Sequence, residues 1–450
     1  MKSYNILLFL IGMWTSTQIN VIGFLGISEL VIYLIAPFVY LRNRLLFKRD
    51  GLGLLFTLLF LTMVSCLISG LYNENGLIAT IKGFASIYGV FACVTVLYPL
   101  IRKNPNGMKW LLLGLAISSV IAIFVFQAGS AHTSAGAGKM EISREDLQDS
   151  VTGYALFWVN LIKQWTTLPI RMYYLSMPSW YCVLTPFAIS SYALISTSSG
   201  RSAFLIGMMS VVMFIVGGKT FRSLSRLRKN FVVIMSLLVV MGYVFASVYK
   251  YTAQYGLLGE KAQTKYERQI KNSSHGTGII GMLIGGRVEF FIGATACLKH
   301  PILGCGPRAE DREGLIEYFY SRYGTQEDLN EYARTVAMDA AKGIFYRRIP
   351  AHSHIITFWL WYGIAGGMFW GYVLWVMAMT LKKYISAIPQ WFGYFALIIP
   401  SAVWSIFFSP FGDRVQKSLL ICCCFIVKNV SEGRVRLPSG MIKEAMEKAR

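Results

Sequence analysis

The chain has 450 residues, of which 55% are hydrophobic and only 14% are charged, and its formal net charge is +21. Soluble domains carry about 25% charged residues, so this composition excludes an ordinary soluble protein and indicates an integral membrane protein. The basic residues stand in short runs between apolar stretches. This pattern excludes nucleic acid as the expected partner and favours anionic membrane lipid.

Apolar stretches follow one another along the chain. A membrane-spanning helix needs about 20 apolar residues, and fewer where the bilayer thins around it. We therefore predict an all-α integral membrane protein with about twelve transmembrane helices and a large periplasmic loop that carries short helices. The predicted spans are Asn5–Ser16, Val21–Leu41, Gly51–Gly70, Leu77–Ile101, Met108–Gln127, Ser150–Trp165, Leu175–Thr197, Ser202–Val216, Phe231–Tyr249, Gly363–Leu381, Trp391–Phe408 and Val415–Val427.

The positions of the basic runs predict the orientation. Such runs follow the second, fourth, eighth, tenth and last predicted spans. If both termini are cytoplasmic, all of these runs lie inside, as the positive-inside rule requires. This orientation depends on the weakly apolar stretch Ser150–Trp165 crossing the membrane; the alternative is that it re-enters on the same side. The predicted domains are N-terminal membrane helices (1–249), a periplasmic loop (250–352), C-terminal membrane helices (353–430) and a basic cytoplasmic tail (431–450).

The large loop contains most of the polar chemistry. Eleven of the 22 acidic residues lie between Lys250 and Arg348. Apolar residues at helical spacing predict a helix over Arg287–Leu298, which Pro301 would end. Gly304 and Gly306 predict a tight turn with exposed backbone N–H groups.

Arginines on the outer side are candidates for binding a phosphate-bearing ligand. An arginine can donate two parallel hydrogen bonds to a pyrophosphate and keeps its charge at all relevant pH values. The alternatives are that Arg201 extends to the membrane interface and that Arg287 pairs with an acid such as Glu289. The candidates are Arg201, Arg287, Arg308, Arg347 and Arg348.

His352 and His354 stand just before an apolar stretch, at the expected membrane surface. Histidine is the usual general base near neutral pH, but both could also be packed interfacial residues. Together with His300 they could bind a metal, although no third ligand has convincing spacing, so we predict no metal and no cofactor.

Two further features leave alternatives open. Glu29 lies within a predicted span, where an acid is costly and is a functional candidate, or else near the mouth of that span. Cys297 and Cys305 could form a disulfide, although neither their spacing nor their context requires one.

Three segments resemble motifs of the O-antigen ligase/polymerase superfamily of bacterial inner-membrane proteins. Ser199–Ala203 (SGRSA) is similar to that family's segment at a helix mouth, with Gly and Arg placed differently. Arg287 followed by Lys299–Gly306 (KHPILGCG) resembles its Arg-helix-Pro-Leu-Leu-Gly-x-Gly element. His352 followed by Gly363–Gly366 (GIAG) resembles its His-Asn…Gly-Leu-Leu-Gly element, with Ser353 where Asn is common.

This resemblance implies metal-independent transfer of a glycan from an undecaprenyl-diphosphate carrier to a glycolipid or glycan acceptor. It implies that Arg201 and Arg287 stabilise the diphosphate leaving group and that His352 activates the acceptor hydroxyl. His354, Arg308, Arg347 and Arg348 are expected only as neighbours that contact diphosphate or glycan.

The sequence does not separate a ligase from a repeat-unit polymerase, because the two differ in acceptor and not in reaction. A transporter or flippase for a lipid-linked glycan is the alternative of another class. It would need basic residues in a cavity but no hydroxyl-activating histidine. The absence of a Walker A pattern argues against transport driven by ATP bound to this chain.

Overall fold

The computed structural model describes residues 3–15, 18–20, 24–125, 288–323, 348–350, 352–388, 391–409, 411–412 and 414–435, together with 206–210, 213, 247, 251–252, 254–255, 263, 330 and 333. Within this part the protein is helical, apart from one short hairpin. The hairpin pairs β1 (Gln18–Asn20) with β2 (Phe24–Gly26) in antiparallel register, with Ile19 opposite Leu25.

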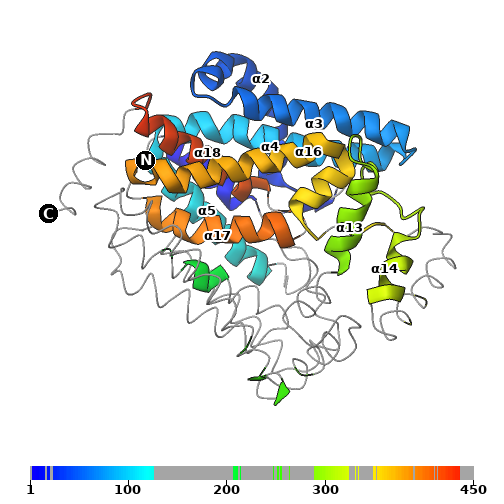
Figure 1. The fold of residues 1–450 in the computed structure, drawn as a ribbon. Helices are drawn as coiled ribbons and strands as arrows, with labels where there is room; N and C mark the ends of the chain where they lie inside the picture. The colour runs from blue at the N-terminus through cyan, green and yellow to red at the C-terminus, as the bar shows by residue number, and fades with distance from the viewer. Residues whose placement is uncertain are drawn as a thin grey trace.

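The helices are, in chain order, α1 (Ser3–Met13), α2 (Ile27–Arg49), α3 (Gly53–Tyr72), α4 (Leu77–Lys103), η1 (Pro105–Gly107), α5 (Met108–Val125), α13 (Val288–Lys299), α14 (Leu315–Tyr323), α16 (His354–Met379), η2 (Thr380–Tyr384), η3 (Ile385–Ala387), α17 (Phe392–Phe408) and α18 (Arg414–Ser431). Figure 1 shows α3, α4, α16 and α18 packed along one another, with α13 and α14 together at one end of this bundle.

Four helical segments are long and apolar enough to cross a membrane: α2, α3, α4 and the continuous stretch His354–Tyr384. The described part of the chain therefore has the character of a membrane-embedded helical protein. Eight of the twelve predicted spans coincide with helices α1 to α5 and α16 to α18. The predicted spans 150–165, 175–197, 202–216 and 231–249 lie outside the described residues, apart from isolated positions, so the count of twelve stays a prediction.

Apolar side chains cover the outside of α2, which is the least buried of these segments. Leu34, Phe38 and Leu45 are 67%, 75% and 75% exposed. The inward side of the same helix packs Tyr40 and Phe47 against Phe56 of α3. An apolar outer surface of this kind suits contact with hydrocarbon chains rather than with water.

A buried carboxylate joins three helix ends. Asp50, just after α2, is fully buried and accepts a hydrogen bond from the Tyr98 hydroxyl at 2.9 Å and an ion-paired hydrogen bond from Arg102. The Asn429 side chain of α18 donates to the Asp50 carbonyl at 2.9 Å. The basic residues in the last turns of α2 and α4 and after α18 are thereby brought to the same end of the bundle, and Arg434 donates to the Arg49 carbonyl at 3.0 Å.

Helix α16 begins earlier than the sequence predicted. We expected it to start at Gly363, but it starts at His354 and is interrupted at Gly363, which has φ 63° and ψ −158°. The glycine therefore marks a bend within the helix and not its beginning, and the bend lies beside α13 (Figure 1).

Candidate functional site

The turn that follows α13 closes the break in α16. The Cys305 N–H donates to the Leu360 carbonyl at 2.7 Å, and the Ile364 N–H donates to the Ile302 carbonyl at 3.1 Å. A Cβ on Gly363 would lie 1.8 Å from the Ile302 oxygen, so the approach requires glycine. The two glycine-containing segments quoted above, Lys299–Gly306 and Gly363–Gly366, are thus in direct contact.

The same turn is held from the other side by the loop between α3 and α4. The Asn75 side chain donates to the Cys305 carbonyl at 2.8 Å, and the Asn73 side chain donates to the Gly304 carbonyl at 3.3 Å. The Gly304 N–H donates to the His300 carbonyl at 3.0 Å. The expectation of exposed N–H groups is therefore wrong for Gly304 and Cys305, whose N–H groups are bonded to the protein's own backbone.

A solvent-accessible histidine–carboxylate pair lies at the start of α16. The His352 Nε2 atom is 3.3 Å from the Glu289 carboxylate, and the two side chains are 46% and 39% exposed. Glu289 stands in the first turn of α13, which packs on α16 through Ile292 and Ala296. A carboxylate in this position can fix the orientation and tautomer of the imidazole. The sequence offered Glu289 as a partner for Arg287, which lies outside the described residues; the structure shows that Glu289 contacts His352.

His354 has a different environment from His352. Its side chain is fully buried, its Nδ1 contacts the Ser405 carbonyl, and its ring packs edge-on against Trp370 and Phe411 at centroid distances of 5.2 and 5.4 Å. The expectation that His354 contacts the substrate is corrected here, because a ring enclosed by α17 and aromatic side chains presents no surface to a ligand. The packed alternative describes it.

Two of the five candidate arginines lie within the described residues. Arg308 and Arg348 are held near one another by a backbone connection in which the Ile349 N–H donates to the Ala309 carbonyl at 2.9 Å and Glu310 is bridged to Arg348. Burial and the neighbouring Arg348 charge lower the pKa of the Arg308 guanidinium. Arg201, Arg287 and Arg347 lie outside the described residues.

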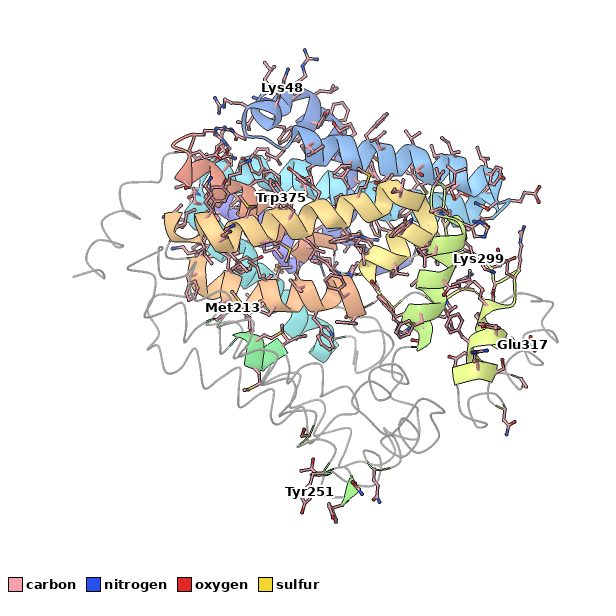
Figure 2. The ribbon with its side chains drawn as sticks, viewed as in Figure 1. Lys48, Met213, Tyr251, Lys299, Glu317 and Trp375 are labelled. Atoms are coloured by element: carbon pink, nitrogen blue, oxygen red, sulfur yellow. The ribbon has the colours of Figure 1, made fainter. Side chains whose placement is uncertain are left out.

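The end of α13 is tied to the loop before α14 by an exposed charged cluster that the sequence did not indicate. Lys299 Nζ and His300 Nε2 each lie 2.6 Å from a carboxylate oxygen of Glu313. Figure 2 places Lys299 beside α14 and Glu317 on it, at the same end of the molecule. His300 is thus engaged by Glu313, and the described residues contain no group of three His, Cys, Asp or Glu side chains that could hold a metal ion.

A polar cavity of about 120 Å³ lies between this cluster and the loop joining α3 to α4. A cavity of this size can hold several water molecules. Its polar lining residues are Asn73, Asn75, His300, Glu310, Asp311, Arg312 and Glu313.

No protein-family model, curated protein or solved structure matches this chain. The resemblance to the O-antigen ligase/polymerase superfamily rests on the three motif segments alone. Two of them, around Gly304 and Gly363, touch each other, while Ser199–Ala203 lies outside the described residues.

The two features that the sequence left open have structural answers. Glu29 is buried and forms a two-fold ion pair with Arg414 at the start of α18, with N–O distances of 3.1 and 3.0 Å. It also accepts a hydrogen bond from the Gly26 N–H at 3.2 Å.

Cys297 and Cys305 are free thiols, and burial raises the pKa of each to about 12.

Proposed function

We propose that this protein transfers a glycan from an undecaprenyl-diphosphate carrier to an acceptor hydroxyl at the periplasmic face of a bacterial inner membrane, as an inverting, metal-independent enzyme of the O-antigen ligase type. The observation that carries the proposal is the accessible His352–Glu289 pair at the start of α16. Glu289 lies two residues after Arg287, so the pair is close in sequence to the arginine proposed to bind diphosphate.

The reaction forms one bond and breaks one. The acceptor oxygen attacks the anomeric carbon of the carrier-linked sugar, its proton passes to His352, and the bond from the anomeric carbon to the diphosphate oxygen breaks with both electrons leaving on the diphosphate. Attack opposite the leaving group inverts the anomeric centre. A positioned base contributes about 10²–10⁴-fold in rate, and each fixed donor on the developing charge contributes about 3–4 kcal/mol. We assign these donors to Arg201 and Arg287, with Arg308, Arg347 and Arg348 as further contacts for diphosphate or glycan.

The proposal includes twelve spans, cytoplasmic termini and a periplasmic segment 250–352. Support comes from the bundle end around Asp50, which gathers the basic residues in the last turns of α2 and α4 and after α18. The positive-inside rule assigns such an end to the cytoplasm. The polar α13–α14 segment, which is tied to the other end of the bundle at the start of α16, would then be periplasmic.

The test is a substitution of His352 in the source strain. His352→Ala should abolish the long-chain surface glycan and cause the lipid-linked precursor to accumulate, with normal membrane levels of the protein. Long lipid-linked chains would assign the protein as a ligase, and single repeats would assign it as a polymerase. His300→Ala is the matched control, because His300 is similarly exposed and is paired with Glu313. An unchanged glycan in His352→Ala would contradict the proposal and favour a transporter.

A further inference from the structure

The carboxylates around α13 and α14 contact some of the nearby basic residues and not others. Glu289 contacts His352, Glu313 contacts Lys299 and His300, and Glu310 lies 3.9 Å from Arg312. Asp311 is used as a cap, since its two oxygens accept the N–H groups of Leu315 and Ile316 at 2.8 and 2.7 Å. Each of these contacts is 3.3 Å or shorter, apart from the 3.9 Å contact between Glu310 and Arg312.

Arg308 and Arg348 take no part in these ion pairs. Among the residues that the structure describes, neither guanidinium has a carboxylate within ion-pairing distance, although Glu310 lies directly across the backbone bridge from Arg348. The two like charges repel each other, and among the described residues Glu310 is within ion-pairing distance of Arg312 and not of Arg348. A fold that keeps them together gains from an anion between them.

The backbone conformation of Arg308 is energetically unfavourable. Its φ is 57°, in the left-handed region that non-glycine residues rarely adopt. The flanking contacts fix it there, since the Ala309 N–H donates to the Gly306 carbonyl at 3.2 Å and the Ala309 carbonyl accepts from Ile349. Arg308 is half-buried and Arg348 is exposed, so the pair lies at the surface, where a ligand can reach it.

We propose that Arg308 and Arg348 together form a binding site for one phosphate group, which specifies the contact with diphosphate or glycan that the transferase proposal assigns to them. Two guanidinium groups can donate paired hydrogen bonds to the oxygens of one phosphate. The phosphate belongs to a lipid headgroup or to a ligand that arrives from the water side. The inference stands on the contacts above and does not depend on the transferase proposal.

The probe is inorganic pyrophosphate, titrated onto the full-length protein in nanodiscs of neutral phosphatidylcholine. Arg308→Gln and Arg348→Gln should each raise the Kd by about tenfold, which corresponds to about 1.4 kcal/mol. Arg312→Gln is the matched control, because it removes the same charge from the same loop at a residue that already has Glu310 as a partner. Its Kd should change less than twofold.

Arg308→Gly separates binding from folding. Glycine adopts φ 57° without strain, so this variant should melt no lower than the wild type and should still lose binding to the same extent as Arg308→Gln. The proposal is overturned if the wild type does not bind pyrophosphate, if the three glutamine variants bind equally, or if Arg308→Gly retains full affinity.

A second arm identifies the source of the phosphate and leaves the proposal standing in either case. Nanodiscs that contain phosphatidylglycerol should raise the apparent Kd for pyrophosphate if the site takes a lipid headgroup. An unchanged Kd assigns the site to a ligand from the water side.

Discussion

At the scale of single residues, the two histidines before and at the start of α16 have opposite roles although they are two positions apart. His352 is accessible and oriented by Glu289, while His354 is enclosed by Trp370 and Phe411. Sequence spacing could not separate them, because burial depends on α17 and on the loop before α18. It also could not pair His352 with Glu289, which lies in a different helix far earlier in the chain.

Gly363 is the residue on which the contact between the two motif segments depends. Gly363→Ala should strongly destabilise the protein, because the new Cβ would lie 1.8 Å from the Ile302 oxygen at a φ of +63°. The combination of φ 63° and ψ −158° is adopted essentially by glycine alone and costs another residue about 1–3 kcal/mol. Thermal unfolding in detergent should show a marked decrease in Tm.

Gly371 provides the control for this prediction. It lies in the same helix, and a Cβ there would meet nothing within 4 Å. Gly371→Ala should leave the Tm unchanged or raise it, since alanine is favoured over glycine in a helix by about 1 kcal/mol. Equal effects of the two substitutions would show that the Gly363 contact is not required.

At the scale of elements, the ion pair between α2 and α18 is buried at the membrane end that also contains the start of α16. Glu29→Gln should destabilise the protein by about 3–5 kcal/mol, because it leaves the Arg414 charge buried without a partner. Arg414→Gln should have a similar effect. The double variant should be less destabilised than the sum of the two single variants, as measured by thermal unfolding in a double-mutant cycle. Additive effects would mean that the two side chains do not stabilise each other.

The link between α13 and α14 predicts a pH dependence. Hydrogen bonds from Lys299 first, and from His300 next, lower the pKa of the Glu313 carboxyl from the ordinary 4.5. The ionised carboxylate therefore stabilises the folded state above the unfolded-state pKa, and this stabilisation is lost as the pH falls through the lower folded-state pKa. At pH 7, Glu313→Gln should lower the free energy of unfolding by less than about 1 kcal/mol, because the partners are exposed, with a slightly lower Tm. This difference from the wild type should become smaller as the pH falls below 4.5.

Most of the described elements were predictable from hydropathy, and their boundaries agree with the structure to within a few residues except at α2, which runs over Ile27–Arg49 where Val21–Leu41 was predicted, and at α16. There the predicted start at Gly363 was wrong because the glycine was interpreted as a helix boundary. In the structure the break is closed by hydrogen bonds from the turn after α13, so helix continues on both sides. Such bonds join residues about sixty positions apart, and no local pattern in the chain indicates them.

At the scale of the whole molecule, we expect the basic bundle end near Asp50 and the polar α13–α14 segment to lie on opposite sides of one membrane. Lys48 and Glu317, both exposed and both labelled in Figure 2, represent the two regions. A cysteine at each position should respond differently to a maleimide that does not cross membranes. Glu317→Cys should react in cells whose inner membrane is intact, and Lys48→Cys should react only after that membrane is permeabilised.

The unsubstituted chain is the control for this labelling, since Cys66, Cys93 and Cys297 are buried and Cys305 is only partly exposed. Reaction at Glu317→Cys before permeabilisation would place the His352–Glu289 pair on the side where carrier-linked glycans would be transferred. Reaction only after permeabilisation would put α14 in the cytoplasm, and with it α13, to which α14 packs. The periplasmic transferase proposal would then fail, while the phosphate site at Arg308 and Arg348 would remain open to its own binding test, because pyrophosphate reaches both faces of a nanodisc.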